Sequence, residues 1–152
     1  MQKLYAAWGE KPAFVKDYVK SLKTAQSPII NSEKGLEEVI EKMLKFRGYI
    51  EGGIVLREVK DLNTATESRF FVLNSEVFYK NDLVEPQMLE MAQEISQKTN
   101  LFFYSIDIAK DNKNHLWLIE IGDGQVSDCV GWEVKKFVDI FEKLKIKNNF
   151  KP

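Results

Sequence analysis

Apolar positions recur along the first half of the chain with the periods of both strands and helices. Residues 13–18 mix apolar and charged side chains and predict a first strand, followed by a loop over 20–31. From Ser32 to Gly48 the apolar residues repeat with helical spacing, so we expect a helix that Ser32 caps and Gly48 ends. The segment 49–59 is rich in Ile, Val and Leu and predicts a buried strand.

The second half of the chain predicts two hairpins and two further helices. Residues 61–67 are polar and predict a loop, and the β-branched and aromatic residues around Asn74-Ser75 predict a hairpin. Pro86 opens a helix with one apolar face, and the polar turn 110–114 joins two more strands. The order βαβ-ββ-α-ββ-α predicts an α+β fold with a mostly antiparallel sheet. The last helix has apolar residues that we expect to face inward, namely Val134, Phe137, Val138, Phe141 and Leu144.

The composition fits one ordinary domain and argues against a binder driven by charge alone. The 152 residues carry 22 Lys+Arg and 23 Asp+Glu, a net charge of −1, and 44% are hydrophobic. We expect a single domain over 1–152, with a basic tail that frays over 145–152. A general nucleic-acid or membrane-surface binder would carry a clustered basic excess, so neither partner is expected. The apolar runs are shorter than the ~18 residues of a membrane span, and the first residues do not resemble a signal peptide.

Cys129 and His115 are the only cysteine and the only histidine of the chain. An internal disulfide therefore cannot form, and a zinc site built from repeated Cys and His pairs is excluded. Neither residue has a partner in sequence that would make it a catalytic nucleophile or base. We expect a reducing, cytoplasmic setting.

Lysines mark the end of the first predicted strand. Lys16 and Lys20 lie four residues apart where this strand gives way to a loop. Lysines in such a position can hold phosphate oxygens as mobile point charges. A solvated strand end with ordinary surface lysines is the alternative.

Charged residues also flank the next apolar strands. Arg57 and Glu58 end the predicted buried strand, and Glu67 and Arg69 open the following hairpin. Such residues are either paired with one another or directed into a cleft. An ion pair between Arg57 and Glu67, or between Glu58 and Arg69, is the alternative to a role in binding.

Two carboxylates lie on the strands of the second hairpin. Counting outward from Asn112 does not make Asp107 and Glu120 direct partners, although they could share a face of the sheet. Glu120 stands among apolar residues, where an unpaired carboxylate is costly. A hard divalent cation such as magnesium would offset that cost, and a buried acid paired with Arg or Lys is the alternative.

Taken in this order, the segments resemble the nucleotide-binding part of the ATP-grasp superfamily over about residues 13–132. That superfamily has a lysine strand, a strand ending in an acid at the adenine hinge, a hairpin opened by acid-x-Arg, and two strands with magnesium-binding acids. The matching residues here are Phe14-Val15-Lys16-Asp17, Leu56-Arg57-Glu58-Val59, Glu67-Ser68-Arg69, Asp107 and Glu120. The resemblance implies that Lys16 faces the nucleotide phosphates, Glu58 holds the adenine, and Asp107 and Glu120 bind magnesium.

The amino-acid sequences of the motifs resemble even more closely those of a bacterial and phage clade named for one arginine and two lysines. On this resemblance Lys16 and Lys20 are the two lysines, and either Arg57 or Arg69 is the arginine. Three matching stretches carry the similarity: Phe-Val-Lys-Asp-Tyr-Val-Lys-Ser, Gly-Gly-Ile-Val-Leu-Arg-Glu and Glu-Ile-Gly-Asp-Gly-Gln-Val-Ser.

The chain departs from the superfamily pattern in several places. Gly122 stands where most members have asparagine, so Asp123 is expected to supply the third metal ligand, in a loop that Gly122 and Gly124 let turn tightly. Between Lys16 and Gly35 there is no glycine, so the usual lid over the phosphates is replaced or lost.

The strand with Lys16 also starts close to the first residue, whereas full-length relatives carry an N-terminal domain. We therefore expect an open sheet edge at this strand. Either a missing N-terminal domain or a homo-oligomer would cover it, and the chain would be a fragment or a natural short form.

The resemblance implies an ATP- and magnesium-dependent ligase that activates a carboxylate as an acylphosphate for attack by an amine. Lys16, Lys20 and Arg69 would neutralise the phosphates, with Arg57 as a further candidate, and the carboxylate and amine substrates are unknown. The alternative is a catalytically reduced nucleotide-binding or protein-interaction module. A protein kinase is disfavoured because the His-Arg-Asp and Asp-Phe-Gly motifs are absent.

Overall fold

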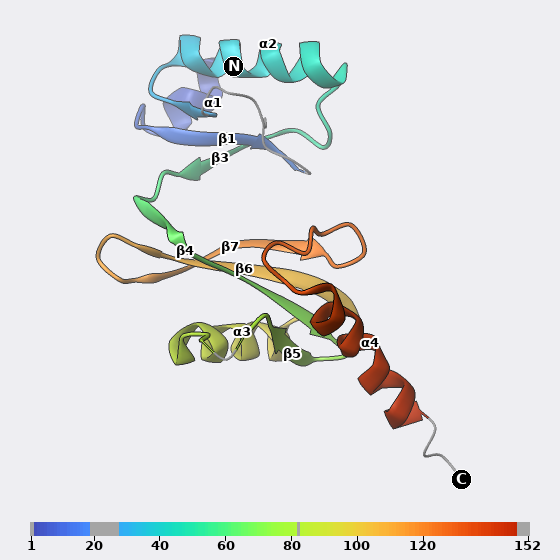
Figure 1. Ribbon diagram of the computed structural model, residues 1–152. Helices are drawn as coiled ribbons and strands as arrows, with labels where there is room; N and C mark the ends of the chain where they lie inside the picture. The colour runs from blue at the N-terminus through green and yellow to red at the C-terminus, as the bar shows by residue number, and fades with distance from the viewer. Residues whose placement is uncertain (1, 19–27, 82, 149–152) are drawn as a thin grey trace. The chain divides into compact units, whose positions relative to one another are not determined.

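The computed structural model describes residues 2–18, 28–81 and 83–148 and divides into two compact units, Met1–Lys60 and Asp61–Pro152 (Figure 1). The described residues form four helices and two sheets in which all strand pairs are antiparallel. This confirms the α+β fold with mostly antiparallel strands. The single domain expected over 1–152 stays a prediction, because one domain can contain two compact units.

The first unit is built on a small sheet with the strand order β2-β1-β3. The central strand is the one that carries Lys16, so the open sheet edge expected at this strand is wrong. One of its two neighbours, β2, is a short strand inside the segment 20–31, which we expected to be a loop. The elements are α1 (Gln2–Ala7), β1 (Ala13–Asp17), β2 (Ile29–Ile30), α2 (Glu33–Arg47) and β3 (Ile54–Glu58).

Helix α2 begins and ends as its sequence predicts. The Ser32 hydroxyl accepts a hydrogen bond from the Gly35 N–H at 3.1 Å, which satisfies one of the free donors of the first turn. At the other end Gly48 has φ 79°, and its N–H donates to the Leu44 carbonyl at 2.7 Å.

Strand β3 is shorter and less buried than the sequence suggests. Gly52 and Gly53 have φ angles of 73° and 128°, so the chain turns there, and β3 begins only at Ile54. Its residues are half-buried or exposed. The buried strand expected over 49–59 is therefore wrong in both extent and burial.

Strand β1 turns alternate residues toward α2. Ala13, Val15 and Asp17 are buried, and the first two join the core of the unit with Leu36, Val39, Ile40 and Met43 of the helix. Asp17 is fully buried and lies 2.7 Å from the Arg47 guanidinium in the last turn of α2. This ion pair connects the end of β1 to the end of the helix.

The second unit contains a four-stranded sheet with the order β5-β4-β6-β7. Residues 61–67, which we expected to form a loop, fall almost entirely within β4, so that prediction is wrong. Leu62 pairs with Asp111 and Asn63 with Lys110, while most of the segment is exposed to solvent and shows no apolar alternation. The elements are β4 (Leu62–Leu73), β5 (Glu76–Tyr79), α3 (Pro86–Lys98), β6 (Phe103–Asp111), β7 (Leu116–Asp123) and α4 (Val134–Asn148).

In the second unit, the two hairpins and the helix start that we predicted from local sequence patterns are confirmed. Asn74 and Ser75 have φ angles of 50° and 64°, as a two-residue turn between β4 and β5 requires. Pro86 is the first residue of α3, where its missing N–H costs nothing. The hairpin of β6 and β7 also forms around the polar turn 110–114.

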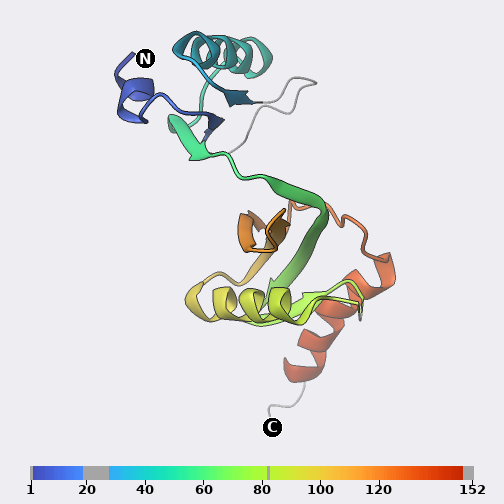
Figure 2. The same cartoon turned by 90° about the vertical axis from the view of Figure 1, so that its left-hand side faces the viewer.

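The two helices pack against opposite faces of the four-stranded sheet. Met88 and Ala92 of α3 contact the side chains of Phe70 and Val72, whereas α4 contacts those of Phe71 and Leu73. Neighbouring residues of a strand point to opposite faces, so each helix has a face of its own (Figure 2). The α4 side is aromatic, with ring centroids 4.9–5.2 Å apart between Phe71 and its neighbours Phe137 and Trp132.

Helix α4 buries a different stripe from the one expected. Phe137 and Phe141 pack inward as predicted, but Val134 and Val138 are 78% and 46% exposed, and Ile140 is buried instead. The inward prediction for the two valines is therefore wrong. The helix continues to Asn148, inside the range 145–152 that we expected to fray, and the side chain of Leu144 lies outside the described residues.

Candidate functional site

Charged side chains form a row across the four-stranded sheet. In the strand register, Arg69 on β4 lies directly opposite Asp107 on β6, and Asp107 lies directly opposite Glu120 on β7. Directly opposed residues of antiparallel strands share one face, so the three side chains lie on the α4 face of the sheet. Counting outward from Asn112 missed this alignment for two reasons. The pairs next to the turn, such as Lys110 with Leu116, are centred on residue 113, and Ile119 is an extra residue between the Ile108–Leu118 and Asp107–Glu120 pairs.

Arg69 and Asp107 form a two-pronged ion pair at the centre of this row. Arg69 Nε and Nη2 donate to the two carboxylate oxygens of Asp107 at 2.7 and 2.6 Å. The Asp107 side chain is only 5% exposed. Hydrogen bonding to Asp107 raises the pKa of Arg69 above its usual value, although burial acts in the opposite direction. A buried acid paired with an arginine, one of the two alternatives from the sequence, therefore describes Asp107.

Glu120 differs from Asp107 in its surroundings. It is exposed, so the cost of an unpaired buried carboxylate, which we expected from its apolar neighbours in sequence, does not arise. Glu120 and Glu67 lie close enough to Arg69 for their charges to raise its pKa further. The charges of three carboxylates thus act on this guanidinium, and even with Lys80 nearby the group keeps a negative excess that favours a cation.

Of the two ion pairs considered from the sequence, the one between Glu58 and Arg69 is replaced by others, and the one between Arg57 and Glu67 stays a prediction. Arg69 pairs with Asp107 rather than Glu58, and Glu58 pairs with Lys60 at 2.6 Å. Hydrogen bonding and charge from Lys60 lower the pKa of Glu58.

Asp123 lies apart from the other two proposed metal ligands. It pairs with Tyr104, an odd number of positions from Glu120, and strand alternation therefore puts its side chain on the opposite face. Its Oδ1 accepts a hydrogen bond from the Gln125 N–H at 2.9 Å. Within 2–18, 28–81 and 83–148, no three His, Cys, Asp or Glu side chains are grouped to hold a metal.

The remaining pair of carboxylates still fits magnesium. In nucleotide enzymes this ion is commonly bound by one or two carboxylates together with substrate phosphates and water. Asp107 and Glu120 provide such a pair, and a carboxylate that accepts two hydrogen bonds from arginine keeps further lone pairs. The assignment of Asp107, Glu120 and Asp123 as metal ligands stays a prediction.

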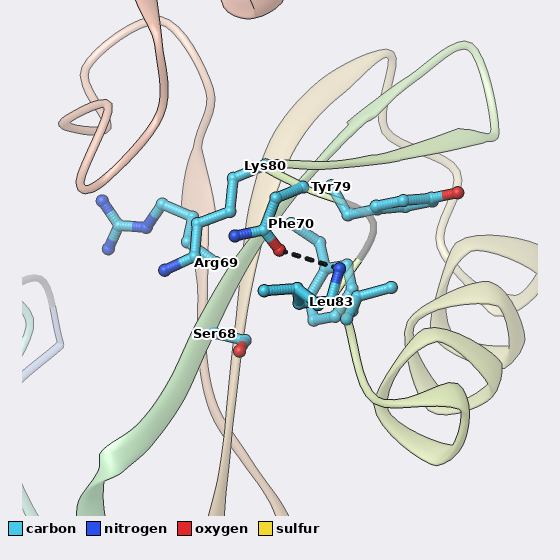
Figure 3. Close-up of a pocket in the computed structure, with 8 residues that line it drawn as sticks. Ser68, Arg69, Phe70, Tyr79, Lys80 and Leu83 are labelled. Atoms are coloured by element: carbon cyan, nitrogen blue, oxygen red, sulfur yellow. Dashed lines mark hydrogen bonds between the residues drawn. The ribbon is translucent and has the colours of Figure 1, made fainter.

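Lys80 is a further cation beside the row that the sequence analysis did not single out. Phe70 pairs with Tyr79, so the next position of this register brings Lys80 beside Arg69. Figure 3 shows the side chains of Arg69 and Lys80 extending to the same side of the strands and the Tyr79 ring to the other. Alternation counted through the Asn74-Ser75 turn would have found it.

A small cavity of about 140 Å³ lies beside Lys80 (Figure 3). Pockets that hold small molecules are usually about 300–1,000 Å³, so this cavity is too small for a nucleotide. Asp107 and Glu120 do not line it. The lining residues are Ser68, Arg69, Phe70, Tyr79, Lys80, Asn81, Leu83 and Val84.

In the first unit, two of the candidate cations, Lys16 and Arg57, lie on the face of the sheet that points away from α2. Lys16 alternates with the buried residues Val15 and Asp17 and is half-buried. Arg57 pairs with Phe14, which shares the face of Lys16. Lys20 lies outside the described residues, so its expected role remains a prediction.

The family follows from comparison with known proteins. Residues 6–144 match a family model for the ATP-grasp domain, so the chain belongs to the ATP-grasp superfamily. Within it, the model is that of family 3 of the clade named for one arginine and two lysines. ATP-grasp domains bind ATP, and the nucleotide-binding class expected from the sequence is thereby supported. No curated protein matches the chain.

In the part of the chain that the structure describes, no helix has the length and apolar character needed to cross a membrane.

Proposed function

We propose that the protein is an ATP- and magnesium-dependent ligase of the carboxylate–amine type. The observation that carries this proposal is the row of Arg69, Asp107 and Glu120, a cation beside two carboxylates on one sheet face. In such a reaction a substrate carboxylate oxygen attacks the γ-phosphorus of ATP, which gives an acylphosphate and ADP. An amine then attacks the acyl carbon, and phosphate leaves as the amide bond forms.

Positioning and charge provide most of the acceleration in phosphoryl transfer, and the proposed residues have the matching charges. Lys16, Lys20 and Arg69 would neutralise the phosphate oxygens, and Arg57 and Lys80 are further cations for the same role. Glu58 would hold the adenine at the hinge. These roles are inferred from the family pattern and, for the residues that the structure describes, from the sheet faces on which the side chains lie.

Magnesium, when bound, would neutralise charge on the β- and γ-phosphate oxygens. Asp107 and Glu120 would hold it from the α4 face of the sheet, whereas Asp123, the third ligand expected from the sequence, has its side chain on the opposite face. Because Asp107 is already held by Arg69, its carboxylate is fixed in orientation before any ligand arrives. Preorganised charge of this kind lowers the cost of reorganisation during the reaction.

The test is turnover of ATP to ADP by the purified protein with magnesium and a panel of small carboxylates and amines. Glu120→Gln should abolish metal-dependent nucleotide binding while the protein without ligand melts at the same temperature or higher, because like charges near Asp107 are reduced. Glu94→Gln, which affects an exposed acid of α3, is the matched control. A lower melting temperature for unliganded Glu120→Gln, with the shift caused by magnesium and ATP retained, would overturn the metal assignment.

The second candidate is a nucleotide-binding or protein-interaction module that does not complete a reaction. Gly122, in place of the usual asparagine, favours it. A wild-type protein that binds magnesium and ATP but produces no ADP with any acceptor would support this candidate. A cytoplasmic setting, unknown acceptor substrates and possible self-association remain part of the proposal.

A further inference from the structure

Gly122, where the ATP-grasp pattern has asparagine, is a glycine for reasons of space. The loop after β7 does turn tightly, since the Val126 N–H donates to the Asp123 carbonyl at 3.2 Å, but neither Gly122 nor Gly124 has a positive φ in it. A Cβ at position 122 would lie 2.9 Å from Ser105 Oγ and 3.1 Å from Ser127 Oγ. Two hydroxyl groups therefore occupy the space that a side chain would take.

These hydroxyl groups lie on the same sheet face as the carboxylate row. Gly122 pairs with Ser105, two positions along the strands from the pair of Asp107 and Glu120. Residues two positions apart in a strand share a face, so the Ser105 side chain lies on the side of Asp107. Ser127 comes from the loop after β7, and its Oγ is 2.8 Å from that of Ser105.

The hydrogen bonds of the two serines fix which way the hydroxyl groups point. Ser127 Oγ donates its single hydrogen to the Asp123 carbonyl at 2.8 Å. In the contact between the two serines, Ser105 must therefore be the donor and Ser127 the acceptor. Ser127 Oγ then keeps one free lone pair. Ser105 is buried, 2% exposed, whereas Ser127 is half-buried, so Ser127 is the one that a ligand can reach.

We infer that the Ser127 hydroxyl oxygen takes the place of the asparagine oxygen as a neutral ligand of the divalent cation proposed at Asp107 and Glu120. Ser105 is a positioning residue that holds Ser127 in this orientation. Hard cations accept neutral oxygens as well as carboxylates, and a neutral ligand adds no charge to a face that already carries a negative excess. The side chain of Asp123 lies on the opposite face, but its backbone carbonyl helps to orient Ser127 by accepting the hydrogen of the hydroxyl group. This inference rests on the proposed function.

The experiment measures manganese binding, as a paramagnetic stand-in for magnesium, in the presence of a non-hydrolysable ATP analogue. The electron paramagnetic resonance signal of free manganese decreases as the ion binds, so a titration gives the affinity without any turnover. Ser127→Ala and Ser105→Ala should each weaken manganese binding by about 10-fold, the lower end for residues that supply or orient a ligand. Ser127→Thr keeps the hydroxyl and should bind as the wild type does. Ser68→Ala is the control, because Ser68 lies on the opposite face of the four-stranded sheet, and it should leave the manganese affinity unchanged.

A rescue variant separates a ligand role from a packing role. Gly122→Asn in the background Ser105→Ala and Ser127→Ala has room for its side chain and should recover most of the lost affinity, whereas loss of packing alone would not be repaired. Melting of each unliganded variant reports whether it folds, and if Ser105→Ala does not, Ser127→Ala at its half-buried position decides the result.

Wild-type affinity in Ser127→Ala would overturn the inference and leave the proposed function standing. No manganese binding by the wild-type protein with the analogue would overturn the proposed metal site itself. A 10-fold loss in Ser127→Ala that the asparagine variant recovers would support the inference, at about the size expected for a ligand or its support.

Discussion

The two sheets use ion pairs in different ways. In the first unit, the buried pair of Asp17 and Arg47 connects β1 to the last turn of α2, whereas Lys16 lies on the face of the same sheet that points away from α2. In the four-stranded sheet, the pair of Arg69 and Asp107 is itself part of the row that contains Glu120. The first unit thus separates residues that hold the fold from residues that could bind a ligand. The second unit assigns both tasks to the same carboxylate.

The largest expected effect is that of Asp107→Asn, because this residue has both tasks. Removing one partner of a buried ion pair typically costs about 3–5 kcal/mol of unfolding free energy. The variant should also lose metal-dependent nucleotide binding. Denaturant titration measures the first loss, and manganese titration with a nucleotide analogue measures the second. Unchanged stability would show that Asp107 is not needed to hold Arg69, and the contrast between the two sheets would disappear.

Asp17→Asn should affect stability alone. The loss of unfolding free energy should be about 3–5 kcal/mol, the range typical of a buried ion pair. Nucleotide affinity of the folded fraction should not change, because Asp17 points toward α2. Calorimetric titration below the melting temperature checks this. Weaker binding by the folded protein would mean that the two faces of the small sheet are not independent.

Lys16→Ala should show the opposite behaviour, with a loss of binding and little loss of stability. A charge-assisted hydrogen bond to phosphate is worth about 1.5–3 kcal/mol, which is the expected loss of nucleotide binding free energy. Lys34→Ala, in the first turn of α2, is the matched control. Equal nucleotide affinities for the two variants in calorimetric titration would return Lys16 to the ordinary surface.

The smallest effect concerns Asp111, which has no proposed role in binding. Partial burial opposes its ionisation, but hydrogen bonds from the Trp117 indole and from the backbone and ring of His115 outweigh burial and lower the pKa of Asp111. A carboxyl with a lowered pKa in the folded state stabilises the fold above its unfolded pKa of about 3.9. That contribution is lost as the pH falls below this value.

Thermal melts from about pH 6 down to about pH 2 provide the measurement. Asp111→Asn should flatten the decline in melting temperature below about pH 4 relative to the wild type. Asp61→Asn, an exposed acid close to the same turn, is the control and should decline as the wild type does. Parallel curves for Asp111→Asn and the wild type would contradict the stabilising role of this carboxylate.

Short-range signals predicted much of the fold correctly. Ser32, Gly48 and Pro86 mark helix ends through their own backbone chemistry, and the Asn74-Ser75 turn joins its strands directly. Such signals act over a few residues and need no knowledge of the rest of the chain. The polar half of β4 lacked them, because strands exposed to solvent need no apolar alternation.

The candidate site was predictable in residue type but not in arrangement. The acids at 107 and 120 stood out in the sequence, yet their direct opposition depends on a bulge in β6–β7 that no local pattern specifies. The same bulge decides which face Asp123 occupies. Lys80 was missed because its proximity to Arg69 is a property of paired strands rather than of neighbouring residues.

Cys129 is a natural site for attaching a spectroscopic label. It is the only cysteine of the chain and is exposed, and it follows Asp128, whose carbonyl accepts a hydrogen bond from Arg69 at 2.7 Å. A thiol-reactive nitroxide or fluorophore would therefore attach at a single place, in the loop next to this arginine. Changes in the spectrum of such a label on adding nucleotide or manganese would be read from one known position, without removing any other residue.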